Sequence, residues 1–179
     1  MKKIILTAAA VFAFSFANAQ DAKSFGFAKG DIFGTGTVSS ESFSEKGKNT
    51  VTKFNTSVGY FLNDNIVLSA GFETESNGNI KKSAPKIGAA YFFNAKNQFS
   101  TNISFGLAAG TGTVISDYKY TRMDLSYGVN YFVSSHFAFI ADVAVLTYES
   151  KTPNGGSAVS TTEIGLNLSK ISFGLVYKL

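Results

Sequence analysis

The last nine residues, Ile171-Ser172-Phe173-Gly174-Leu175-Val176-Tyr177-Lys178-Leu179, decide how the rest of the chain is interpreted. Large apolar side chains occupy the odd positions, whereas Ser, Gly, Val and Lys occupy the even ones. A period of two predicts a β-strand, because successive side chains leave opposite faces of the pleat. The stretch therefore predicts a strand with one bulky apolar face and one face of smaller or charged side chains.

The same alternation returns along the chain with a constant sense. The bulky sets are Phe54, Val58, Tyr60, Leu62; Ile66, Leu68, Ala70, Phe72; Ile87, Ala89, Tyr91, Phe93; Phe99, Ile103, Phe105, Leu107; Met123, Leu125, Tyr127, Val129, Tyr131; and Phe137, Phe139, Val143, Val145. The opposite face carries mostly Ser, Ala and Asn, and glycines at positions 59, 71, 88, 106, 128 and 174. Only 16% of the chain is charged, less than a water-exposed surface normally needs.

The connections between these segments predict the topology. Short turns near residues 63–65, 94–98 and 134–136 alternate with longer polar connections near residues 39–50, 76–83, 111–119 and 150–160. Seven connections join eight strands, as in an up-and-down barrel with short turns on one rim and long loops on the other. The interior of such a barrel has room only for side chains, so the small face is expected inside and the bulky face toward lipid.

The predicted fold class is thus all-β, an eight-stranded antiparallel up-and-down transmembrane β-barrel. The alternative is a soluble lipocalin-like barrel with the bulky face buried. The first strand, near residues 31–38, is so rich in Gly and Thr that the sequence does not show which of its residues face inward. In the eighth strand the bulky residues switch from even to odd positions near Ser169-Lys170. Either a bulge or a segment standing above the membrane would account for this switch.

The N-terminus has the pattern of a cleaved signal peptide. Lys2 and Lys3 precede an apolar run, and Ala17-Asn18-Ala19 has the small-x-small form of a cleavage site. The run is too short to span a bilayer as a helix, which needs roughly 20 residues; a buried N-terminal helix is the alternative. We expect residues 1–19 to be the signal peptide, exported through the Sec pathway, and residues 20–179 to be the barrel domain.

A family resemblance rests on three stretches. Lys29-Gly30-Asp31 opens the first strand, Gly59-Tyr60-Phe61-Leu62-Asn63-Asp64-Asn65 forms a short turn, and residues 171–179 form the last strand. With the signal peptide, they resemble the small outer-membrane β-barrel protein family of the OmpA and OmpX type. The resemblance implies a Gram-negative outer-membrane location and insertion by the outer-membrane assembly machinery, which reads a terminal strand ending in an aromatic residue. Here that strand holds Phe173 and Tyr177 and ends at Leu179.

Two groups of side chains follow from the barrel prediction. Tyr60, Tyr91 and Tyr131 recur just before the short turns, and with Tyr177 they are expected to form an interfacial aromatic belt. Charged residues of the small face must be paired inside a lipid-bounded barrel. The expected interior charge network is Lys53, Glu73, Lys86, Arg122, Asp124, Asp142 and Lys170. A wet path for small ions is the alternative interpretation of the same charges.

The sequence predicts no catalytic, cofactor-binding or metal-binding residues. The single histidine, His136, falls in a short turn, and Glu73 with Glu75 is expected to be solvated or salt-bridged. Without cysteine there is no thiolate metal site. Without Lys2 and Lys3 the formal charge falls from +4 to +2, which gives no reason to expect nucleic-acid binding.

We therefore expect a non-enzymatic, monomeric outer-membrane protein with a structural, envelope-integrity or surface-interaction role. The alternatives are a narrow porin-like channel for small solutes or ions and, third, a lipid A-modifying enzyme. The expected partners are outer-membrane lipid, lipopolysaccharide and the assembly machinery. Lysines expected on the long-loop rim, either solvated or against lipopolysaccharide phosphates, are Lys46, Lys48, Lys81, Lys82 and Lys151.

Overall fold

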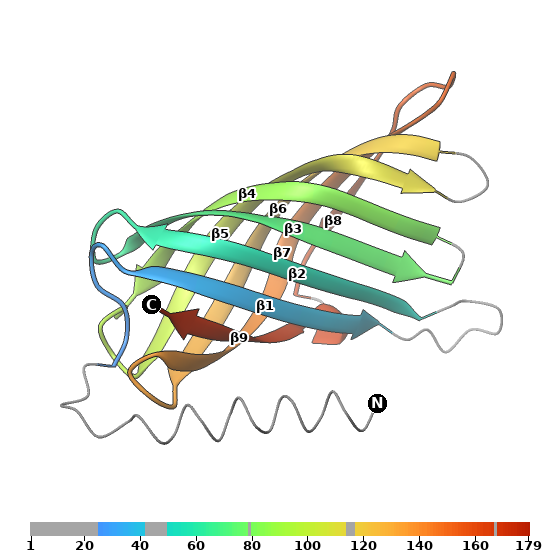
Figure 1. Ribbon diagram of the computed structural model, residues 1–179. Helices are drawn as coiled ribbons and strands as arrows, with labels where there is room; N and C mark the ends of the chain where they lie inside the picture. The colour runs from blue at the N-terminus through green and yellow to red at the C-terminus, as the bar shows by residue number, and fades with distance from the viewer. Residues whose placement is uncertain (1–24, 42–49, 79, 114–116, 167) are drawn as a thin grey trace.

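The computed structural model describes residues 25–41, 50–78, 80–113, 117–166 and 168–179 (Figure 1). The signal-peptide prediction for residues 1–19 lies outside this part of the chain. The strands are β1 Ile32–Glu41, β2 Val51–Phe61, β3 Ile66–Asn77, β4 Ile80–Phe93, β5 Phe99–Thr113, β6 Asp117–Phe132, β7 Phe137–Pro153, β8 Val159–Ile164 and β9 Ser172–Lys178. A 3₁₀ turn, η1 Leu168–Lys170, precedes β9. Within the described ranges, no helix is long and apolar enough to cross a membrane.

The strands close into a barrel through the C-terminal strand. Each strand from β1 to β7 pairs antiparallel with the next, and β9 pairs antiparallel with both β7 and β1. The barrel wall is therefore β1 to β7 plus β9, and the prediction of an eight-stranded antiparallel up-and-down barrel is confirmed. Because every wall strand has two neighbours up to the level of the Val38↔Phe173 pair, backbone N–H and C=O groups can be satisfied within the sheet there, as lipid requires.

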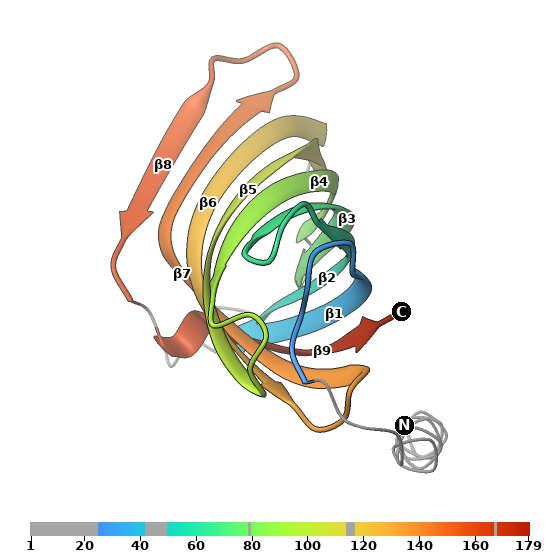
Figure 2. The same cartoon turned by 90° about the vertical axis from the view of Figure 1, so that its left-hand side faces the viewer.

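The expected eighth strand is two separate strands. β9 pairs with the lower part of β7, from Phe137↔Tyr177 to Asp142↔Ser172. β8 pairs with the upper part, from Leu146↔Ile164 to Lys151↔Val159. Gly165, at a φ of 129° that favours glycine, and η1 lie between them, so the phase change near Ser169 is a break in the strand and not a bulge. Figure 2 shows β8 diverging from the barrel wall.

A bulge does occur, but in β7. The β6–β7 register shifts where Leu125↔Leu146 is followed by Ser126↔Ala144, so Val145 is the extra residue. A bulge reverses which face the following residues occupy. Even-numbered Asp142 and odd-numbered Glu149 therefore both line the lumen.

The bulky face points outward, as predicted. Tyr60, Phe105 and Phe173 are all exposed, whereas a soluble barrel would bury them together. The structure also shows which residues of the first strand face inward: Phe33 and Thr37 are buried, and Val38 is exposed. An apolar girdle of this kind costs free energy in water in proportion to its area, roughly 25 cal/mol per Å². It is stable where acyl chains cover it.

Two of the expected long connections are tighter than the sequence suggested. β3 ends at Asn77 and β4 begins at Ile80, while β5 ends at Thr113 and β6 begins at Asp117. Thr and Tyr favour strands, and cross-strand pairs stabilise them. The strands therefore continue into residues that the sequence analysis assigned to the two connections. β6 and β7 reach 16 and 17 residues, more than the roughly 9–11 that a spanning strand needs, so they extend beyond the apolar girdle at the end opposite the short turns.

The glycines of the small face make closure possible. A Cβ at Gly174 would lie within 3.0 Å of the Gly36 carbonyl oxygen on β1, whereas a Cβ at Gly36, on the outer face, would meet nothing within 4 Å. Gly174→Ala is expected to lower the free energy of unfolding in detergent by about 1–3 kcal/mol, because the β1–β9 seam must shift. Urea unfolding followed by heat-modifiability gels measures this. Gly36→Ala is the matched control, and equal stability of the two variants would contradict the packing argument.

Candidate functional site

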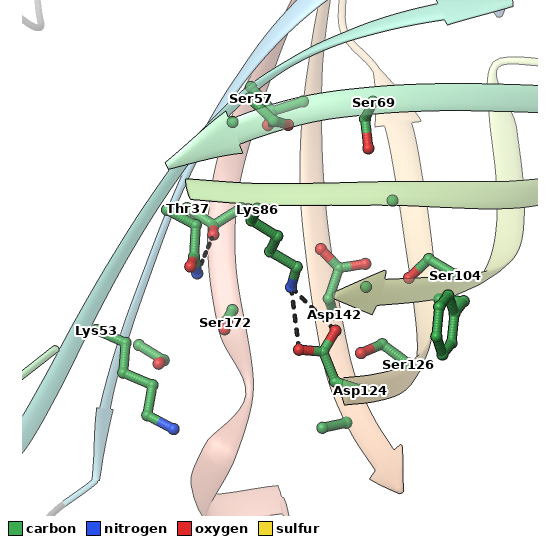
Figure 3. A pocket seen from close by; sticks show the side chains of 18 of the residues that line it. Thr37, Lys53, Ser57, Ser69, Lys86, Ser104, Asp124, Ser126, Asp142 and Ser172 are labelled. Atoms are coloured by element: carbon green, nitrogen blue, oxygen red, sulfur yellow. Dashed lines mark hydrogen bonds and ion pairs between the residues drawn. The ribbon is translucent and has the colours of Figure 1, made fainter. Parts of the chain in front are cut away.

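The lumen forms a cavity among the described residues. Its cavity has a volume of about 480 Å³ and extends from Phe27 and Phe33 at the short-turn end to Glu41 and Lys151 at the opposite, long-loop end. Its middle is lined by small polar side chains from many strands (Figure 3): Thr35, Thr37, Asn55, Ser57, Ser69, Ser104, Ser126 and Ser172. Some bond to one another, as Thr35 Oγ1 does with Ser57 Oγ at 2.8 Å. The cavity is therefore polar but narrow.

An aromatic plug closes the short-turn end of the lumen. Phe27, which is 1% exposed, stacks on Phe61 with ring centroids 4.7 Å apart and meets Phe132 edge-on at 4.8 Å. Phe33 and Phe92 complete the cluster at 5.2 and 5.4 Å from Phe27. Phe61, Phe92 and Phe132 come from three different strands, so the plug joins the barrel wall to the segment before β1.

That segment is fixed by polar contacts as well as by the plug. The Phe27 N–H donates to the Ala95 carbonyl at 2.7 Å, and the Lys178 ammonium donates to the Gly26 carbonyl at 2.7 Å. Gly26 has a φ of +83°, and a Cβ there would collide with the Ala95 carbonyl oxygen. Lys178 also lies 3.5 Å from Asp31. The C-terminal strand thus anchors the N-terminal segment in the mouth of the barrel.

A buried ion pair lies across the lumen above the small polar side chains. Arg122 of β6 donates from Nη2 to Glu73 of β3, and both residues are buried. The Tyr120 hydroxyl donates to the same carboxylate at 3.4 Å. The other guanidinium nitrogens lie 3.5 Å from Asp124 and 3.8 Å from Glu75. A planar guanidinium with several donors is suited to joining carboxylates from different strands.

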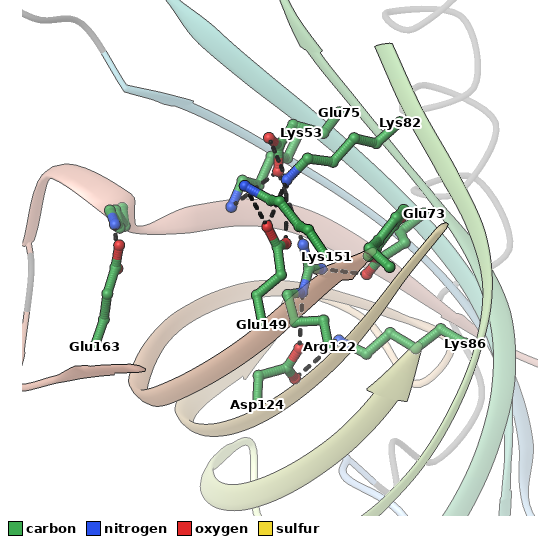
Figure 4. A network of polar contacts seen from close by, with 12 residues as sticks. Lys53, Glu73, Glu75, Lys82, Lys86, Arg122, Asp124, Glu149, Lys151 and Glu163 are labelled. Carbon is green, nitrogen blue, oxygen red and sulfur yellow. Dashed lines mark hydrogen bonds and ion pairs between the residues drawn. The ribbon is translucent and has the colours of Figure 1, made fainter. Parts of the chain in front are cut away.

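A second layer of alternating charges continues toward the long-loop end (Figure 4). Lys82 lies 3.2 Å from Glu75 and 2.9 Å from Glu149. Each of these acids has a further lysine: Lys53 lies 3.3 Å from Glu75, and Lys151 lies 2.9 Å from Glu149. The layer therefore links β2, β3, β4 and β7 across the lumen.

The lowest part of the network depends on glycine. Lys86 donates to Asp124 at 2.9 and 3.1 Å, and this pair lies against Gly106, where a Cβ would meet both side chains. Asp142 lies in the same way against Gly128 and faces the Lys86–Asp124 pair (Figure 3). Among the described residues, Asp142 itself forms no ion pair within 4.0 Å.

The expected network residues thus fall into two groups. Lys53, Glu73, Lys86, Arg122 and Asp124 are joined by ion pairs across the lumen, and Asp142 lies beside them. Lys170 of η1 lines the same cavity but pairs with Glu163 of β8, which lies apart from the main cluster (Figure 4). The break in the strand before Lys170 separates this pair from the other network residues. What these charges do remains a prediction.

Two further sets of lumen residues were misassigned or missed. Lys82 and Lys151 were expected on the loop rim, but both point inward because β4 is longer than expected and β7 has a bulge. Lys81 is exposed on the outer face, and Lys46 and Lys48 lie outside the described residues. The plug was missed, although the sequence carries its signal: Tyr60-Phe61, Tyr91-Phe92 and Tyr131-Phe132 each pair an outward Tyr with an inward Phe.

The outer surface at the short-turn end carries the expected tyrosines. Tyr60, Tyr91, Tyr131 and Tyr177 are 46–49% exposed. Cross-strand register places them near the short turns, as in Ile66↔Tyr91 and Phe137↔Tyr177. Their role as an interfacial belt stays a prediction, as does the role of Phe173, Tyr177 and Leu179 as an insertion signal.

The short turns show local polar chemistry only. His136 Nδ1 lies 2.9 Å from the Lys178 carbonyl oxygen. A hydrogen bond from Lys96 at 2.7 Å, with one from the Lys29 N–H, holds the pKa of Asp64 below its usual value. Within the described ranges, no group of three or more His, Cys, Asp or Glu side chains could hold a metal ion.

Two solved structures of outer-membrane barrels have a similar fold. The N-terminal β-barrel domain of Pseudomonas aeruginosa OprF matches with a TM-score of 0.61 at 14% identity, over 86% of this chain and 100% of that one. Neisserial surface protein A matches with a TM-score of 0.61 at 17% identity, over 86% and 99%. The barrel has the fold of small outer-membrane proteins. No protein-family model matches the sequence, and no curated protein matches it significantly.

The central ion pair can be tested by removing one partner. Arg122→Met leaves Glu73 buried without its cation and is expected to lower the free energy of unfolding by about 3–5 kcal/mol. Adding Glu73→Gln should recover most of the loss, because the uncompensated charge is then gone. Urea midpoints of the refolded barrels measure both effects. Lys96→Met, which breaks the exposed pair with Asp64, is the control and should change little; a double variant no more stable than Arg122→Met would contradict the pairing.

Proposed function

We propose that this chain is a non-enzymatic integral outer-membrane barrel that serves envelope integrity or contacts at the cell surface. Three features support the location: the apolar outer girdle, the tyrosines near the short turns, and the likeness of the fold to the barrels of OprF and neisserial surface protein A. We expect export through the Sec pathway, insertion guided by Phe173, Tyr177 and Leu179, and a monomer surrounded by lipid and lipopolysaccharide.

The observation that carries the non-channel part of the proposal is the plug around Phe27. A pore needs a continuous wet path, whereas five phenylalanines pack together at the short-turn end. The polar cavity above them favours the alternative of a narrow channel, but the cavity ends at the plug. A structural barrel needs the plug and the ion pairs to resist collapse, which fits their position in the lumen.

The arrangement of charges also supports a role other than catalysis. A general base has to face a substrate, and the acids Glu73, Glu75, Asp124 and Glu149 face cations of the same chain instead. His136 lies in a short turn, at the end opposite the long loops. We therefore rank the lipid A-modifying enzyme third, below the channel.

The location is tested on membrane fractions of a Gram-negative host expressing the chain. We expect the protein in the outer-membrane fraction, with a lower apparent mass before boiling than after, because a closed barrel resists detergent unfolding. Recovery in the soluble fraction, or a band that heating does not shift, would contradict the proposal. Unchanged lipid A acyl chains by mass spectrometry, with and without expression, would exclude the enzyme.

Conductance distinguishes the structural role from the channel. We expect refolded wild-type protein in planar bilayers to give no discrete current steps, because Phe27 and Phe132 fill the lumen. Phe27→Ser with Phe132→Ser should produce small steps, whereas Phe99→Ser on the outer face is the control and should stay silent. Discrete steps from the wild-type protein would overturn the non-channel proposal.

A further inference from the structure

The barrel wall is incomplete on one side of its upper half. The β1–β9 ladder ends at Val38↔Phe173, and the β7–β9 ladder ends at Asp142↔Ser172. Above this level, Ser39–Glu41 of β1 pair only with β2, and β8 pairs only with β7. Within the described ranges, no ladder joins β8 to β1 (Figure 2). We call this interruption the slot; it lies above η1, between β8 and the upper part of β1.

The outer border of the slot is apolar. Ile164, Leu166 and Leu168 are 81%, 66% and 71% exposed, more than the large apolar side chains of the paired barrel wall. Val38 and Phe173, at the upper end of the β1–β9 seam, are also exposed. We call Ile164, Leu166 and Leu168 the lip. Such a group suits an acyl chain that lies against the outside of the barrel.

The inner border of the slot is polar and continuous with the lumen. The residues that line the cavity include Ser39 and Glu41 of β1, Thr161 and Glu163 of β8, and Lys170 of η1. The Glu163–Lys170 ion pair lies at this border, apart from the central network (Figure 4). A molecule crossing the slot would thus move from an apolar surface outside to a polar one inside.

The cavity behind the slot carries both signs of charge in equal number. Of the described residues that line it, six are acidic and six are basic: Glu41, Glu75, Asp124, Asp142, Glu149, Glu163; and Lys53, Lys82, Lys86, Arg122, Lys151, Lys170. Within the described part of the chain, Lys53 and Lys151 each pair with a single acid, and their side chains are 33% and 44% exposed, so both keep spare donors. The volume of about 480 Å³ lies within the range of small-ligand sites.

We propose that the slot admits the head group of a zwitterionic membrane amphiphile, a phosphoethanolamine, while its acyl chain stays outside on the lip. The phosphate accepts hydrogen bonds from Lys53 and Lys151, and the ammonium faces the carboxylates of Glu41 and Glu163. Equal numbers of acids and bases favour a head group without net charge over an anionic one. The plug closes the cavity below, so the site holds its ligand and does not pass it on. This inference rests on the proposed membrane location.

The test is native mass spectrometry of the refolded full barrel released from detergent in the presence of lysophosphatidylethanolamine. We expect one retained molecule for the wild-type protein. Leu166→Ser with Leu168→Ser should reduce retention roughly tenfold, because the chain loses its apolar contact. The matched control is Val58→Ser with Ile87→Ser, which removes similarly exposed side chains (59% and 60%) from the intact wall and should retain the lipid. Equal loss in both pairs would overturn the role of the slot.

The head group is tested with a second set of probes. Lys151→Met should weaken retention of the lipid severalfold. Glu149 keeps Lys82 as its partner in this variant, so no buried acid is left unpaired. Lys81→Met, on the outer face, is the control and should not weaken retention. Lysophosphatidylglycerol should be retained less than lysophosphatidylethanolamine, and free O-phosphoethanolamine less than either. Equal retention of the anionic lipid would overturn the zwitterion assignment, and equal retention of the free head group would overturn the role of the lip.

The outcomes separate this inference from the proposed function. A heat-modifiable barrel in the outer-membrane fraction that retains no lysophosphatidylethanolamine would refute the lipid site and leave the proposed function standing. A chain absent from that fraction would refute the proposed function, whatever it retains in detergent.

Discussion

Closure of the hydrogen-bonded ladder by the C-terminal strand is the constraint on which the rest of the structure depends. β9 is only seven residues long, yet it pairs with β1 on one side and β7 on the other. Without it, two sheet edges would lie in an apolar environment with unpaired backbone groups, each costing several kcal/mol. Closure in turn requires small residues inside, which is why Gly174 faces the Gly36 carbonyl across the seam.

The closed wall then determines what the lumen can contain. A barrel of this size leaves room for little besides side chains, and charges enclosed there are stable only when they are paired. Arg122 meets this condition by contacting acids from two strands, and Lys82 by linking Glu75 to Glu149. Because the partners come from opposite sides of the barrel, the ion pairs also brace the wall.

The two ends of the lumen differ, and the difference bears on function. At the short-turn end, Phe27 and its aromatic neighbours make an apolar core of the kind found in soluble proteins. Toward the other end, the wall loses a strand pairing where β8 diverges, and the cavity reaches polar residues at that border. A lumen closed below by the aromatic plug fits the proposed lipid site and is unsuited to conduction across the membrane.

The sequence alone determined the strands, their number in the wall and the direction of their faces, because a period of two is a local property of the chain. It also indicated most of the interior charges, because Glu73, Arg122 and Asp124 alternate with the bulky outward residues of their strands. It could not determine the partners of those charges, because pairing depends on which strands face each other across the lumen. Lys82 and Lys151 were misplaced for this reason, together with the unexpected length of β4 and the bulge at Val145.

The plug and the slot were likewise decided by the tertiary structure. Phe61, Phe92 and Phe132 stand next to tyrosines in the sequence, but only the closed barrel brings them around Phe27. In the sequence, the break between β8 and β9 is visible only as a switch of the bulky residues from even to odd positions. A bulge would have explained that switch equally well. In the closed barrel β8 and β9 pair with different parts of β7, residues 146–151 and 137–142, so the two segments are separate strands.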